Sequence, residues 1–114
     1  MSDLVQKHCV PCEGGTLPLQ EAEVKRLFSE LGGGWELKEG KLTQEFKFHD
    51  FKSAMEFVSR VADIAEKEWH HPDIFISFNK VRLELFTHAI KGLSENDFIV
   101  AAKINQISLP LHNK

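Results

Sequence analysis

An amphipathic segment in the middle of the chain, residues 51–69, constrains the fold most strongly. Its apolar residues recur at helical spacing and form one broad stripe: Phe51, Ala54, Met55, Phe57, Val58, Val61, Ala62, Ile64 and Ala65. Pro72 disfavours helical geometry at His71, so this helix is predicted to end at or just before the pair His70-His71. The stripe must be buried against a second layer, and a chain of 114 residues can form one core.

The segments on either side of this helix have patterns of their own. The predicted elements, in chain order, are a helix over 18–31 ended by Gly32-Gly33-Gly34, strands over 35–37 and 42–48, strands over 74–78 and 81–87, and a helix that opens at Ser94. Asn79 is expected to take the left-handed geometry of the second hairpin. Ser94 and Asp97 have the spacing of a capping box.

The order helix, two strands, helix, two strands, helix predicts an α+β domain. Hairpins make antiparallel sheets, and one apolar stripe per helix suits packing on one face, so we expect a four-stranded antiparallel sheet with three helices on one side. The other face is left for a concave site or a partner. The expected organisation is an extended N-terminal arm over 1–17, a single domain over 18–109 and a C-terminal tail over 110–114.

Charge and composition exclude several classes of function. The formal net charge of −3 gives no electrostatic reason to expect nucleic acid or an anionic membrane as a direct partner. No apolar run reaches the length of a transmembrane helix, and the N-terminus lacks the layout of a signal peptide. Two cysteines, Cys9 and Cys12, fit a reducing compartment, so a cytoplasmic location is expected.

Histidines are the candidate functional residues. His70 and His71 stand where the long helix should end, and His88 stands where the last strand should end. Imidazole can give and take a proton near neutral pH, so such a group could form an acid–base site. Two plain alternatives remain at this point. The pair could only favour the negative end of the helix dipole, and His88 could be solvated surface.

A metal site is not predicted. Adjacent histidines in an extended chain point to opposite sides, and the helical His-x-x-x-His pattern is missing. Cys9-Val10-Pro11-Cys12 lacks the second cysteine pair that a zinc knuckle needs. The arm is therefore expected to carry two free thiols.

Several separated motifs, taken together, resemble one family. They are Glu66-Lys67-x-x-His70-His71-Pro72, Phe78-Asn79-Lys80-Val81, Thr87-His88, and Gly92-Leu93-Ser94-x-x-Asp97 with Ala101. This ordered set is similar to the pterin-4a-carbinolamine dehydratases, over about residues 35–107, and the Cys-x-x-Cys-x-Gly-Gly arm looks like that of bacterial members. Vertebrate members also serve as the dimerisation cofactor of a homeodomain transcription factor.

The resemblance implies a dehydratase that acts on 4a-hydroxytetrahydrobiopterin. It would release water, give quinonoid dihydrobiopterin and so recycle tetrahydropterin for aromatic amino acid hydroxylases. It implies no metal or organic cofactor, and a homodimer or homotetramer. Two alternatives stay open: a non-catalytic interaction module, such as a transcriptional coactivator or assembly factor, and a dehydratase for another pterin.

The resemblance also implies roles for individual residues. His70 and His88 match the principal acid–base pair, and His71 matches a substrate-orienting histidine. Glu66 matches a carboxylate that hydrogen-bonds within the site, while Asp97 could orient His88 or cap the last helix. The segments that would line the pterin, besides the three histidines, contribute Pro72, Thr87, Ala89 and Ile90. Which histidine is the acid and which the base is left open.

Overall fold

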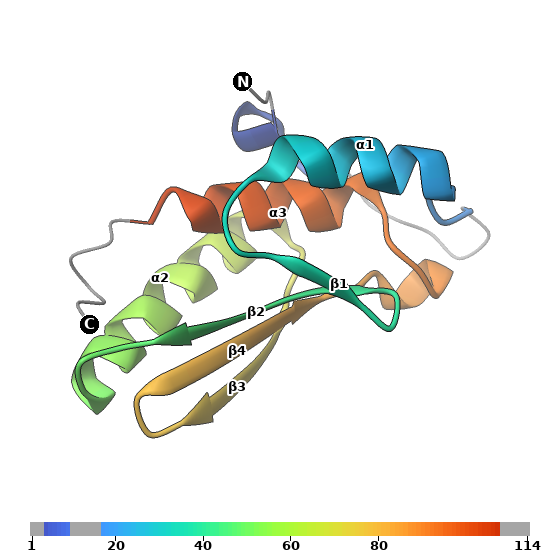
Figure 1. Cartoon of the computed structure of the whole chain (residues 1–114). Coiled ribbons are helices and arrows are strands. Elements are labelled where there is room, and N and C mark those ends of the chain that lie inside the picture. Colours follow the sequence, from blue (N-terminus) through green and yellow to red (C-terminus); the bar gives the residue numbers. More distant parts are fainter. Residues whose placement is uncertain (1–3, 10–16, 108–114) are drawn as a thin grey trace.

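The computed structural model describes residues 4–9 and 17–107. Its elements, in chain order, are η1 (Leu4–Gln6), α1 (Glu21–Leu31), β1 (Glu36–Lys38), β2 (Lys41–Lys47), α2 (Phe51–Glu68), β3 (Asp73–Ser77), β4 (Lys80–Leu85), η2 (His88–Ile90) and α3 (Glu95–Asn105). The predicted α+β class and the order αββαββα are confirmed (Figure 1).

The four strands form one antiparallel sheet in the order β1-β2-β4-β3. Two hairpins are joined through the central pair, in which Leu42 lies opposite Leu85 and Phe46 opposite Val81. Along β4 the side chains of Val81, Leu83 and Leu85 are buried, while those between them face the uncovered side. This is the period-2 alternation of a sheet that packs on one face only.

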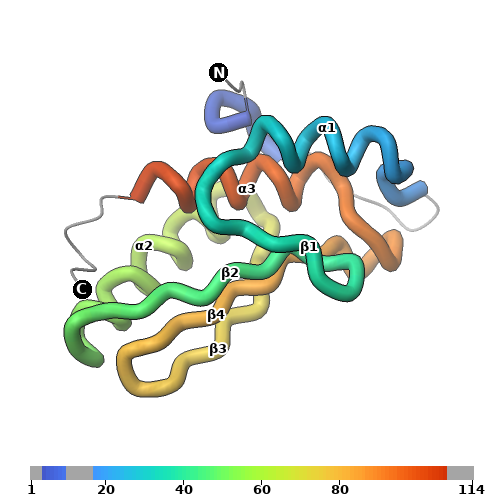
Figure 2. Tube along the Cα trace, viewed as in Figure 1, coloured from blue at the N-terminus to red at the C-terminus, as the bar shows by residue number. Residues whose placement is uncertain are grey.

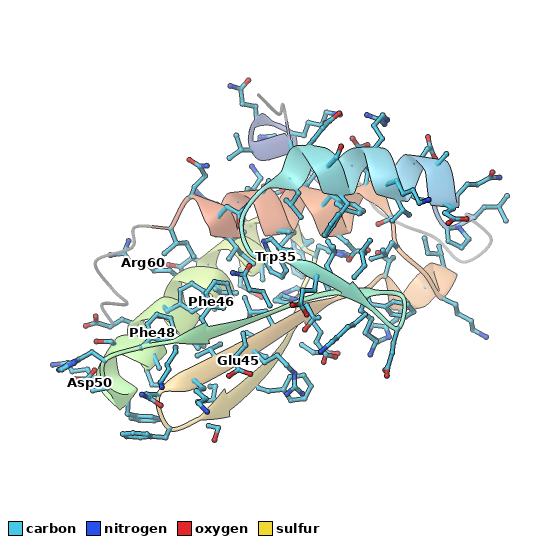
Figure 3. The ribbon with its side chains drawn as sticks, in the orientation of Figure 1. Trp35, Glu45, Phe46, Phe48, Asp50 and Arg60 are labelled. Carbon is cyan, nitrogen blue, oxygen red and sulfur yellow. The ribbon has the colours of Figure 1, made fainter. Side chains whose placement is uncertain are left out.

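All three α-helices lie on the same side of the sheet, as predicted (Figure 1). α2 packs against β4 and α3, whereas α1 lies over α3. The core between the layers is aromatic: the ring of Phe57 on α2 lies 4.6 Å from that of Phe46 and 5.0 Å from that of Phe48. Figure 3 shows Trp35, Phe46 and Phe48 in this layer. Trp35 is buried and its indole N–H donates to Asn105 of α3 at 2.9 Å.

The residues next to each end of α2 explain where this helix begins and where it ends. Asp50 caps its N-terminus by accepting the N–H of Ser53 at 2.8 Å, and this bond lowers the pKa of the Asp50 carboxyl. At the other end Trp69 takes the left-handed conformation, with φ of 52°, and ends the helix at Glu68. The N–H of His70 still bonds to the carbonyl of Ala65 at 3.2 Å. The chain therefore leaves the helix in a fixed direction just before the histidine pair.

α1 begins later than predicted and ends as predicted. It starts at Glu21 rather than near residue 18, and the N-cap position is Gln20, which makes no side-chain cap bond. Gly32 and Gly33 both have positive φ, of 73° and 74°. Glycine takes this region without steric cost, which is why the helix stops there.

The turn between β3 and β4 corrects one expectation. Phe78, with φ of 53°, takes the left-handed position that was assigned to Asn79. The Asn79 side chain is engaged elsewhere, because its amide donates to the carbonyl of Phe48 at 2.9 Å and its own carbonyl accepts the Phe48 N–H. Asn79 thus ties this turn to the end of β2, and Phe78 is left exposed at the tip.

The N-terminal segment is docked on the domain. Leu4–Gln6 forms a turn of 3-10 helix, not the extended arm expected, and lies beside α3 (Figure 2). Leu4 is 1% exposed and belongs to the core, and the Lys103 ammonium donates to the carbonyl of Val5 at 2.9 Å. The expected tail over 110–114 and Cys12 lie outside the described residues. Within residues 4–9 and 17–107, none of the helices has the length and apolar character to span a membrane.

Candidate active site

A cavity of about 760 Å³ is lined by residues from four segments of the chain. Its walls come from the C-terminal end of α2, the segment that follows β4, the N-terminal part of α3 and the N-terminal arm. The lining residues are His8, Cys9, Lys67, Glu68, Trp69, His70, His71, Phe86, Thr87, His88, Ala89 and Asn96. The structure therefore brings His70, His71 and His88 to one cavity, although they come from two separate segments.

His70 is held by a buried carboxylate. Its Nε2 lies 2.6 Å from Oδ1 of Asp97, and the Asp97 side chain is 0% exposed. A carboxylate can only accept, so Nε2 carries the hydrogen and donates it. Nδ1 is then the ring nitrogen that can exchange a proton with a bound molecule. An imidazole whose tautomer is fixed by a carboxylate is the arrangement that acid–base enzymes use.

Asp97 also organises the start of α3. Its Oδ2 accepts the hydroxyl of Thr87 at 2.8 Å and the backbone N–H of Ser94 at 3.0 Å, and the predicted capping box is present. The hydroxyls of Thr87 and Ser94 lie 2.8 Å apart and are hydrogen-bonded. Of the two roles expected for Asp97, the cap is confirmed, but the histidine that it orients is His70 and not His88. Asp97 lies in the first turn of α3, which packs against α2, and His70 follows the end of α2.

His71 pairs with a different carboxylate, that of Glu66. Its Nε2 bonds to Oε2 of Glu66 at 2.8 Å, and both side chains are substantially exposed. The Trp69 ring lies edge-on to His71 at 6.3 Å. Glu66 thus makes the expected hydrogen bond to a site histidine, but it does not itself line the cavity. Its influence on the site acts through the orientation of His71.

His88 was expected where the last strand ends; it lies in η2, because β4 already ends at Leu85. Its ring is exposed and stands edge-on to Phe86, with 5.1 Å between centroids. The loop is closed by backbone bonds between Thr87 and Gly92. A side chain at Gly92 would place Cβ 2.6 Å from Cβ of Pro18, so glycine permits the close approach that anchors this loop.

The other predicted lining residues divide into two pairs. Thr87 and Ala89 line the cavity. Pro72 and Ile90 are buried and do not line it, because Pro72 precedes β3 and Ile90 turns inward at the end of η2. Contact of these two residues with a pterin stays a prediction.

Glu68 is a site residue that the sequence reasoning missed. It continues the buried stripe of α2, since the buried positions of that helix are Ala54, Phe57, Val61, Ala65 and Glu68. Its carboxylate accepts the Cys9 N–H at 2.7 Å and the His8 Nδ1 at 3.0 Å, and Lys103 lies 3.5 Å away. A carboxylate on the apolar stripe of a helix was the available signal, because buried charges need partners.

The electrostatics of this cluster favour an ionised Glu68 and a protonated Cys9. Burial alone would raise the pKa of Glu68, but the bonds from Cys9 and His8 and the charge of Lys103 hold it below its ordinary value of 4.5. Burial, then the charge of Glu68, raises the pKa of the Cys9 thiol to about 12. A thiol of this kind is a poor nucleophile at neutral pH. Among the described residues, no group of three or more His, Cys, Asp or Glu side chains could hold a metal ion.

Comparison with known proteins bears on this site. The model of the family described as pterin 4 alpha carbinolamine dehydratase matches residues 17–107. The chain belongs to this family. A relative from Alkaliphilus metalliredigens is 46% identical over 107 residues, which cover 93% of this chain and 96% of that protein. One from Rickettsia canadensis is 47% identical over 105 residues, which cover 91% of this chain and 96% of that protein. Both carry the provisional name pterin-4-alpha-carbinolamine dehydratase.

A solved structure shares the fold. The crystal structure of the transcriptional coactivator/pterin dehydratase from Brucella melitensis aligns with a TM-score of 0.72 and 37% sequence identity. The alignment covers 77% of this chain and 95% of that one. This similarity supports both the α+β architecture and the family membership.

Proposed function

We propose that this protein is a hydro-lyase that removes water from a 4a-hydroxytetrahydropterin, with 4a-hydroxytetrahydrobiopterin as the reference substrate. The observation that carries the proposal is the pairing of His70 with the buried Asp97 in a cavity that His88 also lines. Family membership supplies the substrate class. The cavity volume falls in the range typical of small-molecule sites.

The reaction needs an acid and a base on one substrate. C4a of the pterin carries the hydroxyl and is bonded to N5. The N5 lone pair forms a double bond to C4a while the C4a–O bond breaks, an acid protonates the leaving oxygen, and a base takes the N5 proton. The products are water and quinonoid dihydropterin, and no electrons are exchanged with another reagent. Imidazoles suit both transfers at neutral pH.

The surroundings of the histidines suggest how the two roles divide. The Asp97 carboxylate would stabilise the imidazolium that forms when Nδ1 of His70 takes a proton, so we assign His70 as the base. No carboxylate of the described residues pairs with His88, which suits it to give up a proton to the leaving oxygen. His71, held by Glu66 at the rim, is assigned to orienting the substrate.

A stopped-flow measurement tests this proposal. 4a-Hydroxytetrahydropterin is generated in the observation chamber of the instrument. Its loss and the appearance of quinonoid dihydropterin are then followed with and without the purified protein. We expect the protein to accelerate both in proportion to its concentration. A protein that binds the pterin but leaves the spontaneous rate unchanged would refute the proposed activity.

The physiological setting is proposed on the family resemblance alone. Recycling of tetrahydrobiopterin for aromatic amino acid hydroxylases would follow from the reaction, since the quinonoid product can be reduced back to the tetrahydropterin. A dehydratase for another pterin is distinguished by comparing kcat/KM for 4a-hydroxypterins that differ in their C6 side chain. The higher value identifies the substrate that the cavity fits best.

Self-association is part of the proposal. β3 is an edge strand whose Phe75 and Ile76 are more than two-fifths exposed, and Phe51 and Met55 are exposed on α2. Exposed apolar groups of this kind are typical of interaction surfaces. We expect a homodimer or homotetramer, to be measured by size-exclusion chromatography with light scattering.

The coactivator alternative is favoured by one observation only, the name of the Brucella melitensis protein. An interaction module would not need a histidine oriented by a buried carboxylate. A variant such as Met55→Glu, altered on the exposed face of α2, should keep the dehydratase rate if catalysis and partner binding are separate.

A further inference from the structure

The N-terminal arm contributes a wall to the proposed pterin site. His8 and Cys9 line the cavity together with the histidines of the domain. These two residues precede the part of the chain that the family model matches, residues 17–107. The cavity is therefore completed by a segment to which the family match assigns no role.

The arm is held in place by several independent contacts. Leu4 is buried in the core, and Lys7 pairs with Glu95 at 2.6 Å. The buried Glu68, 5% exposed, accepts the Cys9 N–H through Oε1 and the His8 ring through Oε2. A half-buried Lys103 neutralises this carboxylate and also binds the arm through the carbonyl of Val5. Glu68 thus tethers the His8 ring at Nδ1, while Glu68 and Lys103 together hold the backbone of the arm.

The ionisation of Glu68 determines which ring nitrogen of His8 can accept a hydrogen bond from a ligand. Since the carboxylate is ionised and can only accept, Nδ1 of His8 carries a hydrogen and donates it. In neutral His8, Nε2 is then a lone-pair acceptor. The ring is 81% exposed, so this nitrogen is open to a bound molecule.

From this arrangement, which rests on the proposed function, we infer that His8 is a substrate-binding residue whose Nε2 accepts a hydrogen bond from an N–H or O–H group of the pterin. A pterin carries such donors on its amino group, its ring nitrogens and its C6 side chain. Glu68 is the positioning residue that sets the tautomer of His8. His8 takes no part in the proton transfers assigned to His70 and His88.

Three substitutions of His8 distinguish the contact of Nε2 with the pterin from the structural role of the bond between Nδ1 and Glu68. His8→Asn keeps an N–H group near the Nδ1 position, for the bond to Glu68, and removes Nε2. His8→Gln places its amide near the Nε2 position, where the oxygen can accept. His8→Ala removes both. The matched control is His49→Ala, because His49 is an exposed histidine that does not line the cavity.

We expect His8→Ala and His8→Asn to raise KM by about three- to tenfold, the loss of one hydrogen bond, with kcat within about twofold of wild type. His8→Gln should lie closer to wild type. Glu68→Gln should raise KM as well, because the amide would present an N–H to Nδ1 and move the His8 hydrogen to Nε2, where it can no longer accept. His49→Ala should leave KM and kcat unchanged.

The same variants are titrated with oxidised biopterin by fluorescence, which measures binding without turnover. An unchanged KM and an unchanged dissociation constant in His8→Ala and His8→Asn would overturn the inference and leave the dehydratase proposal intact. A fall in kcat at unchanged KM would also overturn it. If the wild-type protein binds biopterin but fails to dehydrate, the proposed activity is lost, and the titration still decides the role of His8. A wild-type protein that binds no pterin would remove both proposals.

Discussion

Replacing Asp97 by asparagine should separate the catalytic role of this carboxylate from its role as a helix cap. Asp97 accepts three hydrogen bonds, from His70 at 2.6 Å, Thr87 at 2.8 Å and the Ser94 N–H at 3.0 Å. Asparagine has one oxygen, which can keep the bonds to Thr87 and Ser94. Its amino group then faces Nε2 of His70. Because two N–H groups cannot bond to each other, the His70 hydrogen must move to Nδ1, the nitrogen proposed to take the substrate proton.

The expected magnitudes follow from this rearrangement. In the hydrogen bonds from Thr87 and Ser94, the acceptor changes from a charged carboxylate to a neutral amide oxygen. This change costs about 1 kcal/mol for each bond and about 2 kcal/mol together. For a domain of this size the Tm should fall by about 10 °C. The loss of a correctly protonated base should lower kcat by about 10²–10⁴-fold. The protein should therefore remain folded at 25 °C while its activity almost disappears.

The assay is the stopped-flow measurement at 25 °C, with the Tm of each variant recorded by circular dichroism. Asp63→Asn is the matched control, because Asp63 is an exposed carboxylate on α2 that does not line the cavity. It should leave both rate and Tm unchanged. If folded Asp97→Asn keeps a rate within threefold of wild type, the assignment of His70 as a base oriented by Asp97 is wrong.

Three further perturbations test other parts of the structure. Leu4→Ala should cost about 2–5 kcal/mol of unfolding free energy in urea because Leu4 is 1% exposed, and a loss below 0.5 kcal/mol would mean that the arm is not docked. The lowered pKa of Glu68 makes its bonds stabilising above its ordinary value of 4.5, and this contribution should be lost as the pH falls below that value through the folded-state pKa. Glu68→Gln should abolish this part of the pH dependence of stability between pH 7 and pH 3. A variant whose stability depends on pH as that of the wild type does would contradict the claim that the buried bonds to Glu68 stabilise the fold. In a Cys12→Ser background, Cys9 should react with iodoacetamide at pH 8 far more slowly than in the urea-unfolded chain, because burial raises the pKa of its thiol to about 12, and equal rates would refute this.

Most of the architecture could be predicted because it depends on local patterns. The apolar stripe of α2, the alternation along β4 and the capping box of Ser94 and Asp97 are each properties of a few consecutive residues. The deviation in the turn between β3 and β4, in contrast, comes from a contact between distant residues. Phe78, not Asn79, has positive φ, because the Asn79 side chain is bonded to Phe48, the residue that follows β2. A contact 31 residues away decided which residue took the strained position.

The candidate site was less predictable because its partners come from distant segments. His70 and Asp97 are 27 residues apart, and His8 and Glu68 are 60 residues apart. The sequence could place the histidines at element ends, but it could not show which of them Asp97 would face. The docking of the arm was missed because two apolar residues, Leu4 and Val5, are too few to show a periodic pattern. Only the position of Glu68 on a buried stripe was available as a hint.

The most direct test of the central claim is the rate of 4a-hydroxytetrahydropterin dehydration by the His70→Ala/His88→Ala double variant, compared with wild type at equal concentration. The account predicts strong acceleration by the wild-type protein and a rate near the spontaneous one for the double variant, with a Tm that shows both to be folded. His49→Ala should match wild type. A folded double variant that dehydrates the pterin as fast as wild type would contradict the claim that these two histidines carry the proton transfers.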